Sequence, residues 1–577
     1  MNSQKERGEI SFLAKIAENI PHYEHTNILQ YSNDMLANLV YKHSELKTKP
    51  VVGNVLSSFR DFNGDLNYII DKLNHLLIIG STGSGKSTGP ISAQILASLL
   101  AGIISMIVSD PKGDLYRRYA SLAKRMGYKV KLIDLTDSEH SEAYGIFYNI
   151  ACEFRDVYLK IGKNVKQRSL NGKIIYEYKN RTFYNKDSLA QYYQKEFKSI
   201  LKKSQSKVRD ILAKLLPVES QKDPHWEKNA YKFILALAMS LIVDQFSLNE
   251  KVRTTPDKVN FSNMKDIFDS FSVTRRGAID DKGFLSNRGD DSFLFTEVKR
   301  IFFENAETTM RNYIGFVDDA FTKYNFDAFL DITMTSTISA DDFVDEKTIL
   351  FIKYDEMNKL CQEFLSFMIS SLLGELKKIA DKSEGLTLKR PVLFIVDEFS
   401  SLPKNSDIVN FVAYGRSRNV FIHYVLQDYT QIRSKYQHEA DTLINNSGNI
   451  MFLGSNDYDT LQEFSKQLGK CTILSPQTTC NTSELKNVIF EERPIVTCSE
   501  LSLLQQGEVV VKRFGNVSIK GAFEKSYECK EYQCPPSLIS EYSSELNKIY
   551  DRCQYDVNNI VKVNEDDDED DDDDELF

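Results

Sequence analysis

A short glycine-rich segment, set between an apolar run and a helix-forming run, constrains the fold of this chain more than any other part. Residues 76–79 are four apolar residues, typical of a buried strand, and residues 91–100 are typical of a helix. Residues 80–87 between them read Gly-Ser-Thr-Gly-Ser-Gly-Lys-Ser, which fits the pattern G-x-x-x-x-G-K-S. Strand, glycine loop and helix in this order are the context of a P-loop. The alternative is a chance glycine loop.

The residues of this loop predict a site for phosphate groups and a metal ion. Glycines let backbone N–H groups cradle phosphate oxygens, and the N-terminus of the next helix adds positive charge. We expect Lys86 to reach the β- and γ-phosphates and the Ser87 hydroxyl to bind Mg²⁺. The predicted binding residues are Gly80, Ser81, Thr82, Gly83, Ser84, Gly85, Lys86, Ser87 and Thr88.

A second apolar run, residues 391–396, ends in two carboxylates, Asp397 and Glu398. This pattern is weak alone, but beside a P-loop it indicates a Walker B strand. Asp397 is then predicted to hold the same Mg²⁺ as Ser87, through water. Glu398 is predicted to orient or deprotonate the attacking water. The alternative is a buried strand followed by two exposed acids.

Two polar positions beside the next predicted strand, residues 420–426, are further catalytic candidates. Gln427 ends that strand and is a candidate sensor of the γ-phosphate. Arg416 precedes it, in the sequence Gly-Arg-Ser-Arg, and is a candidate arginine finger for the nucleotide of a neighbouring subunit. The alternatives are a polar strand cap for Gln427 and a surface pair with Arg418 for Arg416.

The chain has 577 residues, too many for a single core, so we expect two or more domains. Its net charge of −10 hides an uneven distribution, because residues 565–575 are eleven consecutive acidic residues and the rest of the chain sums to +1. Such a run predicts a disordered, solvated tail, and often an interaction tail. The eight cysteines are scattered, which indicates a reducing compartment without a disulfide framework.

The longest mostly apolar run, residues 95–108, has fourteen residues, and a membrane-spanning helix needs roughly 20. The N-terminus also lacks the shape of a signal peptide. We therefore expect no membrane span and a cytoplasmic location.

Alternating predicted strands and helices indicate the fold class. Residues 76–135 follow a βαβαβ order, which predicts a parallel sheet, and this texture returns after residue 346. We predict an α/β P-loop domain interrupted by a large all-α insert. The expected parts are an N-terminal helical segment, 1–50; the first part of the P-loop domain, 51–150; the mostly helical insert, 151–345; the second part of the P-loop domain, 346–530; and a C-terminal extension with the acidic tail, 531–577.

The start of the expected insert is strongly basic. Residues 155–214 contain sixteen Lys or Arg and five Asp or Glu, with six tyrosines interleaved. Cations neutralise phosphates and aromatic rings stack on unpaired bases, so this composition suits a nucleic-acid surface. A solvated basic helix bundle with tyrosines in its core explains it equally well.

The order and spacing of these motifs resemble those of type IV secretion coupling proteins, the TraG/TraD-like conjugative ATPases. The segments that carry the resemblance are Asp-Pro-Lys-Gly-Asp at 110–114, like the family's D-P-K-G-E; Asp-Pro-His-Trp at 223–226, like D-P-F-W; Asp-Glu-Phe at 397–399, like its Walker B; Gln-Asp at 427–428, like its glutamine motif; and Arg-Pro at 493–494, like R-P-L. Tyr148-Asn149 resembles its Y-N-P, with Ile150 in place of proline.

The resemblance implies a RecA-like motor that assembles as a homo-hexamer and uses ATP and Mg²⁺. Its implied partners are relaxosome DNA (single- or double-stranded), a relaxase, and a secretion channel or membrane protein. Motif by motif, it implies that Lys86 and Ser87 bind phosphate and Mg²⁺ and that Asp397 and Glu398 support metal and water. It also implies that Gln427 senses the nucleotide and that Arg416 acts across subunits.

Members of that family usually carry N-terminal transmembrane helices, and this sequence shows none. We therefore expect any attachment to the inner face of the cell membrane to be peripheral, through a partner. Two alternatives stay open: a receptor that recruits effector proteins with little DNA contact, and a DNA pump of the FtsK/HerA type. A small-molecule P-loop kinase would not need the large helical insert.

Overall fold

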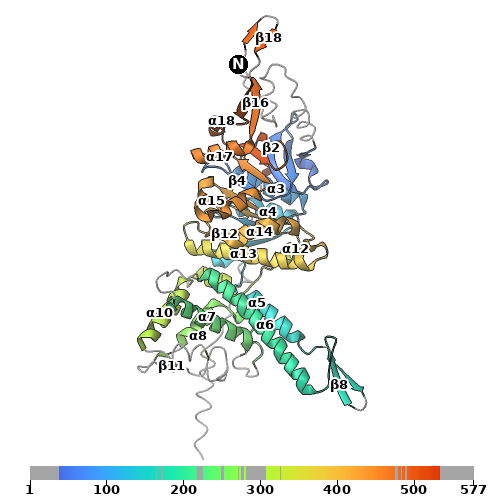
Figure 1. The fold of residues 1–577 in the computed structure, drawn as a ribbon, viewed down its shortest axis with the longest axis vertical. Helices are drawn as coiled ribbons and strands as arrows, with labels where there is room; N and C mark the ends of the chain where they lie inside the picture. The colour runs from blue at the N-terminus through green and yellow to red at the C-terminus, as the bar shows by residue number, and fades with distance from the viewer. Residues whose placement is uncertain are drawn as a thin grey trace, which may run out of the picture. The chain divides into compact units, whose positions relative to one another are not determined.

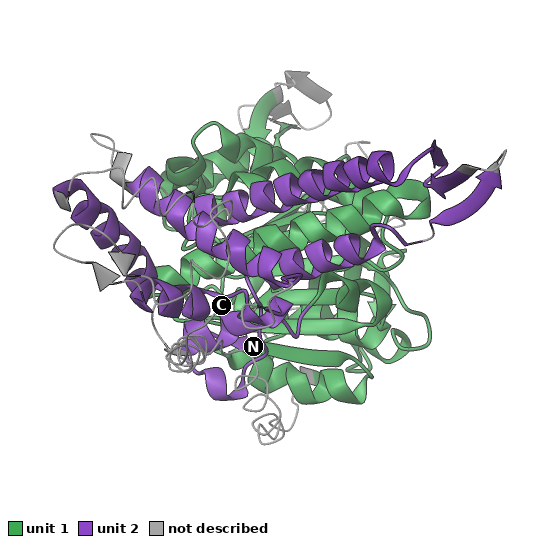
Figure 2. Cartoon of the chain, turned by 90° about the horizontal axis from the view of Figure 1, so that it is seen from below, with its two compact units in different colours: residues 1–132, 339–538 green, residues 133–338, 539–577 purple. Residues whose placement is uncertain are grey.

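The computed structural model describes most of the chain between residues 38 and 532, and its two compact units are drawn in Figure 2. Unit 1 comprises residues 1–132 and 339–538, and unit 2 comprises residues 133–338 and 539–577. The described ranges are 38–163, 165–170, 173–216, 225–247, 253–270, 272–273, 279–280, 296, 307–324, 327–474, 479–481, 484–487 and 490–532. The acidic run 565–575 lies outside them.

Unit 1 is built on a nine-stranded sheet with the order β21-β20-β15-β4-β14-β13-β5-β12-β6 (Figure 1). Neighbouring strands from β15 to β12 are parallel, whereas β20 and β21 are antiparallel to their neighbours. The strands are β4 Leu76–Ile79, β5 Ser105–Ser109, β6 Lys129–Asp134, β12 Thr348–Lys353, β13 Val392–Val396, β14 Val420–Leu426, β15 Asn449–Phe452, β20 Glu508–Arg513 and β21 Ile519–Ala522. Every residue of β4, β5, β13 and β14 is buried, which explains their continuous apolar runs.

Helices connect these strands, as a parallel sheet requires. They are α3 Ser92–Ala101, α4 Asp114–Arg125, α12 Ala340–Asp345, α13 Lys359–Lys382, α14 Ser406–Tyr414, α15 Tyr429–Tyr436, α16 Glu439–Asn445, α17 Tyr458–Leu468 and α18 Cys498–Ser502. Two small hairpins follow α17: β16 Lys470–Leu474 with β19 Phe490–Pro494, and β17 Thr479–Asn481 with β18 Glu484–Asn487.

The prediction that residues 1–50 are helical is wrong for the part that the structure describes. Residues Val40–Lys42 form strand β1, which pairs antiparallel with β3, Leu66–Lys72. Strand β2, Gly53–Arg60, pairs with the other edge of β3. Tertiary pairing and the β-favouring residues Val40 and Tyr41 decide the local structure here. The apolar residues that suggested the helix, Phe12 to Ile20, lie outside the described residues.

Unit 2 is mainly helical, and it also contains a small sheet that the expectation of an all-α insert did not include. Its helices are α5 Tyr148–Lys160, α6 Lys186–Leu215, α7 His225–Asp244, α8 Phe261–Ser270, α10 Glu307–Lys323 and α11 Asp327–Met334. Its strands are β7 Lys166–Leu170, β8 Lys173–Tyr178 and β9 Arg181–Phe183, in an antiparallel sheet, with the short pair β10 Ser272–Val273 and β11 Ile279–Asp280.

In the three-stranded sheet β7–β9, a tight turn joins β8 to β9. Lys179 and Asn180 join β8 to β9 with φ angles of 47° and 60°, the left-handed region that a two-residue hairpin turn uses. The sequence between β7 and β8 is Asn-Gly at 171–172, the strongest sequence signal for such a turn. The prediction for this region rested on its basic composition and did not include these strands.

A buried ion pair ties the last strands of unit 1 to its small N-terminal sheet. Arg513 in β20 donates to Asp71 in β3 at 2.8 Å, and the Arg513 side chain is only 6% exposed.

Removing one partner of a buried pair leaves an unpaired charge. We therefore expect Arg513→Ala to destabilise unit 1 by about 3 kcal/mol, seen as a lower midpoint of denaturant unfolding. The matched control is Lys520→Ala, whose half-exposed pair with Glu508 should matter little; equal shifts in both variants would contradict the assignment.

Candidate nucleotide-binding site

The glycine loop follows β4 at the carboxyl edge of the sheet, and its backbone needs the glycines that the sequence places there. Gly83 and Gly85 have φ angles of 83° and 92°, which side-chain-bearing residues rarely adopt. A Cβ atom on Gly80 would lie 2.4 Å from the Ser84 hydroxyl oxygen. The loop then turns into α3 through the π-type turn Ser87–Ile91.

Lys86 lies inside the loop. Its Nζ donates hydrogen bonds to the carbonyl oxygens of Gly80, at 2.6 Å, and Ser81, at 3.3 Å, and the residue is buried. Burial lowers the pKa of Lys86, while the nearby carboxylates of Glu398 and Asp397 raise it. The loop therefore holds a cation beside the two acids of the predicted Walker B strand.

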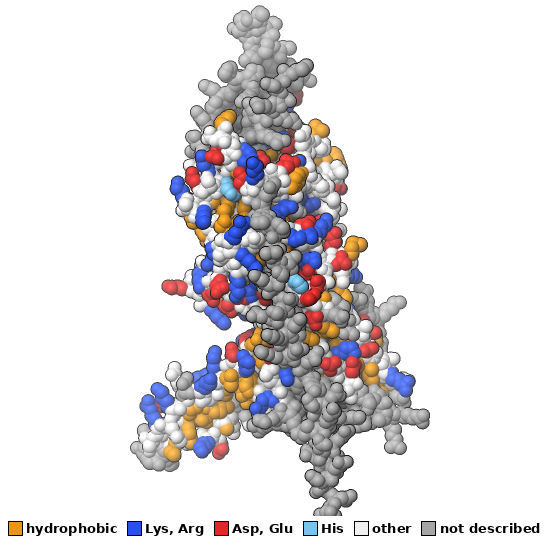
Figure 3. All heavy atoms as spheres, turned by 180° about the vertical axis from the view of Figure 1, so that it is seen from behind, with side chains coloured by type: hydrophobic (Ala, Val, Ile, Leu, Met, Phe, Trp, Pro, Cys, Tyr) orange, Lys and Arg blue, Asp and Glu red, His pale blue; other side chains and the backbone are white. Residues whose placement is uncertain are grey.

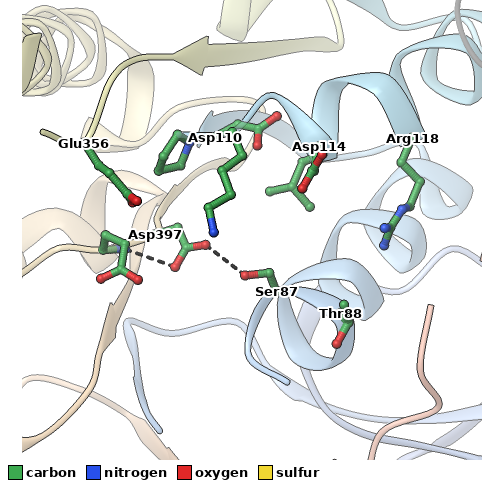
Figure 4. Close-up of a pocket in the computed structure, with 11 residues that line it drawn as sticks. Ser87, Thr88, Asp110, Asp114, Arg118, Glu356 and Asp397 are labelled. Atoms are coloured by element: carbon green, nitrogen blue, oxygen red, sulfur yellow. Dashed lines mark hydrogen bonds between the residues drawn. The ribbon is translucent and has the colours of Figure 1, made fainter. Parts of the chain in front are cut away.

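The structure brings the two halves of the predicted site together. The Ser87 hydroxyl donates to Oδ2 of Asp397 at 3.0 Å, although 310 residues separate them (Figure 4). The Glu398 backbone N–H donates to the other carboxylate oxygen of Asp397 at 3.0 Å. Burial and the neighbouring Glu398 raise the pKa of Asp397, against the opposing effects of Ser87 and Lys86. Ser87 and Asp397 come together because only β14 separates β4 from β13 in the sheet.

Glu398 has an unusual backbone. Its φ angle of 52° is in the left-handed region, which is costly for a residue with a side chain and is concentrated at functional sites. The residue is half-buried and lines two adjoining pockets of unit 1. One of these also contains Ser87, Asp397 and Asp110.

Gln427 lines the second pocket. It directly follows β14, is half-buried, and shares the pocket with Thr82 and Glu398. Its backbone N–H donates to the side-chain oxygen of Gln431 at 3.2 Å. The structure therefore places the candidate sensor on the same side of the sheet as the glycine loop and the Walker B acids.

Arg416 lies away from these residues within the protomer. It is exposed, in the 3₁₀ turn Gly415–Arg418, which precedes β14 and so lies at the opposite edge of the sheet from the glycine loop. Within the described part of the chain, its side chain makes no hydrogen bond or ion pair. Arg418, in contrast, pairs with Asp381 at 3.3 Å. The structure therefore does not bring Arg416 together with the other predicted site residues.

Several residues that the sequence analysis left unassigned line the first pocket. Asp110, Lys112 and Asp114 follow β5, Glu356 follows β12, and all four line the same pocket as Ser87; Asp110, Asp114 and Glu356 are labelled in Figure 4. Burial, together with Asp114 and Asp397, raises the pKa of Asp110 to about 6, although its carboxylate accepts from the Tyr116 N–H at 2.8 Å. Their position after strand ends was the available sequence signal, since ligands bind at this edge of parallel sheets.

One loop contact had no sequence signal at all. The side chain of Gln506 donates to the Gly83 carbonyl oxygen at 2.9 Å, across 423 residues. Close by, the Ser526 N–H donates to the Thr88 carbonyl at 3.0 Å. The chain just before β20 and just after β21 therefore packs against the glycine loop, residues 80–88.

The donor set fits a magnesium–nucleotide pair. Ser87 and Asp397 present oxygen atoms, the ligands that Mg²⁺ prefers. The Ser84 hydroxyl is buried, packs against Gly80, and has no hydrogen-bond partner among the described residues. The described residues contain no group of three His, Cys, Asp or Glu side chains placed to hold a metal unaided. Phosphate oxygens and water would have to complete the coordination of the ion.

Fold and site together define a P-loop nucleotide-binding protein with a RecA-like parallel sheet and a large helical insert. The family described as "Type IV secretory system Conjugative DNA transfer" matches residues 22–548, and the chain belongs to this family. That result confirms the resemblance stated from the motifs. Among the helices that the structure describes, none has the length and apolar character needed to cross a lipid bilayer.

Two solved TrwB structures share the fold at low sequence identity, and a third solved structure is similar at a lower score. The bacterial conjugative coupling protein TrwBdeltaN70, in its trigonal form with sulphate, has a TM-score of 0.51 and 15% identity, covering 84% of this chain and 92% of that chain. TrwB in complex with the non-hydrolysable ATP analogue ADPNP gives 0.50 and 14%, with the same coverage. VirB4 of Thermoanaerobacter pseudethanolicus gives 0.42 and 14%, covering 82% and 96%. No curated protein sequence matches this chain.

Proposed function

We propose that this protein is an ATP-hydrolysing coupling protein of a conjugative type IV secretion system. It would recruit relaxase-bound DNA and drive its delivery to the transfer channel. The observation that carries the proposal is the 3.0 Å hydrogen bond between Ser87 and Asp397, which joins the two nucleotide motifs in a member of the conjugative DNA transfer family. The solved TrwB complex with an ATP analogue supports ATP as the nucleotide.

Each side chain then has a defined task in ATP hydrolysis. The glycine loop and Lys86 bind and orient the phosphates, and Ser87 and Asp397 hold Mg²⁺. The ion, when bound, neutralises charge on the phosphate oxygens. Glu398 orients the attacking water and accepts its proton, and Gln427 senses the γ-phosphate from the adjoining pocket.

The test is the ATPase rate of the purified protein with and without single- and double-stranded DNA, at low and moderate salt. DNA stimulation that fades as salt rises is the expected result for a motor that grips phosphates. Hydrolysis that is indifferent to DNA would instead favour a receptor that recruits effector proteins. A DNA pump of the FtsK/HerA type predicts stimulation by DNA without any binding of relaxase.

We propose further that the active form is a homo-hexamer in which Arg416 reaches the nucleotide of the neighbouring subunit. Its exposure and its lack of an ion pair in the described structure support this role. Attachment at the inner face of the cell membrane would be peripheral, through a partner protein.

The proposed action of Arg416 across subunits is tested by mixing proteins that carry different substitutions. Arg416→Ala and Lys86→Ala proteins should each be inactive alone and regain up to about a quarter of the wild-type rate when mixed in equal amounts, since some interfaces then pair an intact glycine loop with an intact Arg416 of the neighbouring subunit. The change inside a site without its finger is about 10³-fold or more. Arg418→Ala is the matched control, because Arg418 pairs with Asp381 in its own chain. No recovery of activity in the mixture of the two inactive variants would rule out action across subunits.

A further inference from the structure

One face of α6 carries a strip of four cations, Lys195, Lys198, Lys202 and Arg209, which we call the basic strip. Their spacings of three, four and seven residues place them within about 60° of the helix circumference, over about 21 Å of its length. All four are exposed, and no described residue forms an ion pair or hydrogen bond with their side chains. The strip is therefore a line of solvated positive charge with no counterpart in the described fold.

The rest of α6 shows that this strip is not simply surplus charge on a solvated helix. The buried residues of α6, among them Val208 and Leu212, occupy a different face from the strip. Lys203 and Lys207 both pair with Glu153 of α5, and Lys179 pairs with Glu196, so these neighbouring cations have carboxylate partners within the unit. Figure 3 shows Lys and Arg side chains spread along the arm that holds α5, α6 and β8.

Four of the six tyrosines in residues 155–214 pack against other rings, whereas Tyr184 is exposed. Tyr158 stacks on Phe246 with ring centroids 3.7 Å apart, and Tyr178 packs edge-on against Tyr192 and Tyr193. These rings hold the arm together. The basic strip can therefore bind a partner mainly through charge, with little ring stacking. An acidic chain suits such a surface.

We infer that the basic strip of α6 is the docking site for the chain's own acidic segment, residues 565–575. The segment carries eleven consecutive carboxylates, opposite in sign to the strip, and when extended it spans about 36 Å, enough to cover the strip's length. Residues 533–564 join it to the described chain and can extend to about 105 Å. Attachment to the same chain keeps the segment at a high local concentration, so a weak charge-driven contact is enough for occupancy.

This docking would shield the strip from other polyanions until a competitor displaces the segment. The contact is made of exposed charges, so it weakens as salt rises toward the physiological range, where the Debye length is about 8 Å. The inference rests on the basic strip and the acidic segment alone and does not require ATP hydrolysis.

The test uses the full chain with its acidic segment neutralised, every Glu565–Glu575 carboxylate being changed to the matching amide. A fluorescent peptide with the sequence of residues 561–577 is titrated into this protein at about 50 mM salt, with fluorescence anisotropy as the readout. We expect binding, and at least tenfold weaker binding when Lys195, Lys198, Lys202 and Arg209 are also changed to Gln. The matched control removes four other exposed cations, by changing Lys163, Lys166, Lys186 and Lys228 to Gln, and should bind like the parent.

Three outcomes would overturn the inference. The first is equal binding of the peptide by the strip variant and the control variant. The second is peptide binding that is as tight when the native acidic segment is present, since that segment would then leave the strip free. The third is strip-dependent binding of a single-stranded DNA oligonucleotide with no binding of the peptide, which would assign the strip to nucleic acid.

Discussion

Lys86→Ala is expected to reduce ATP hydrolysis by more than about 100-fold while the protein stays folded. Lys86 is the loop's cation, with its Nζ 2.6 Å from the Gly80 carbonyl and with Glu398 and Asp397 close enough to raise its pKa. Without it, no side chain of the loop can offset the charge of the phosphates. The measurement is the steady-state rate of phosphate release, beside the thermal unfolding midpoint of the same preparation.

The matched control for this variant is Lys389→Ala. Lys389 pairs with Asp345 at the protein surface, with both side chains more than 60% exposed, so its loss should leave the rate unchanged. Full activity of purified Lys86→Ala would show that the glycine loop is not the hydrolysis site. A large fall in its unfolding midpoint would instead mean that Lys86 mainly holds the loop together.

Glu398→Gln should separate binding from turnover. The amide keeps the size of the side chain and the backbone at φ 52°, so we expect the nucleotide affinity to stay within about threefold. It cannot accept a proton from water, so the turnover rate should fall by about 10²- to 10⁴-fold. Binding is measured with a fluorescent ATP analogue and turnover by phosphate release.

Glu384→Gln, an exposed acid in the 3₁₀ turn Glu384–Leu386, serves as the control for the change of charge. Normal hydrolysis by Glu398→Gln would mean that another acid of the pocket positions the water. Asp110 and Glu356 would then be the residues to change next, because both line the same pocket.

The sequence predicted the parts of the site that depend on local signals. The segment 76–88 and the strand before Asp397 contain their own strand, turn and helix signals, and the carboxyl ends of parallel strands lie at one edge of a sheet. That reasoning anticipated the meeting of Ser87 and Asp397. Residues 110–114 were noted for their resemblance to a family motif and were given no role in the site.

What escaped prediction depends on pairing between distant segments. The Gln506 contact with Gly83 arises because β20 joins the sheet beside β15, and no short pattern announces this. Strand β1 forms by pairing with β3, against an expectation built on residues 12–20. The β7–β9 sheet did have a local signal in the sequence, the Asn-Gly pair at 171–172. The prediction for this region rested instead on its strong basic charge.

The position of β4 in the sheet delays the pairing of this strand while the chain is being synthesised. Its two neighbours are β14 and β15, so the strand that carries the glycine loop emerges near residue 76 and finds no lateral partner before residue 420. At about 5–20 residues per second, this wait lasts roughly 20 to 70 seconds. Throughout that time an apolar strand is open to wrong pairing, while the intervening unit is synthesised and can fold. Nascent chains of this protein are therefore expected to need chaperones most during the synthesis of unit 2.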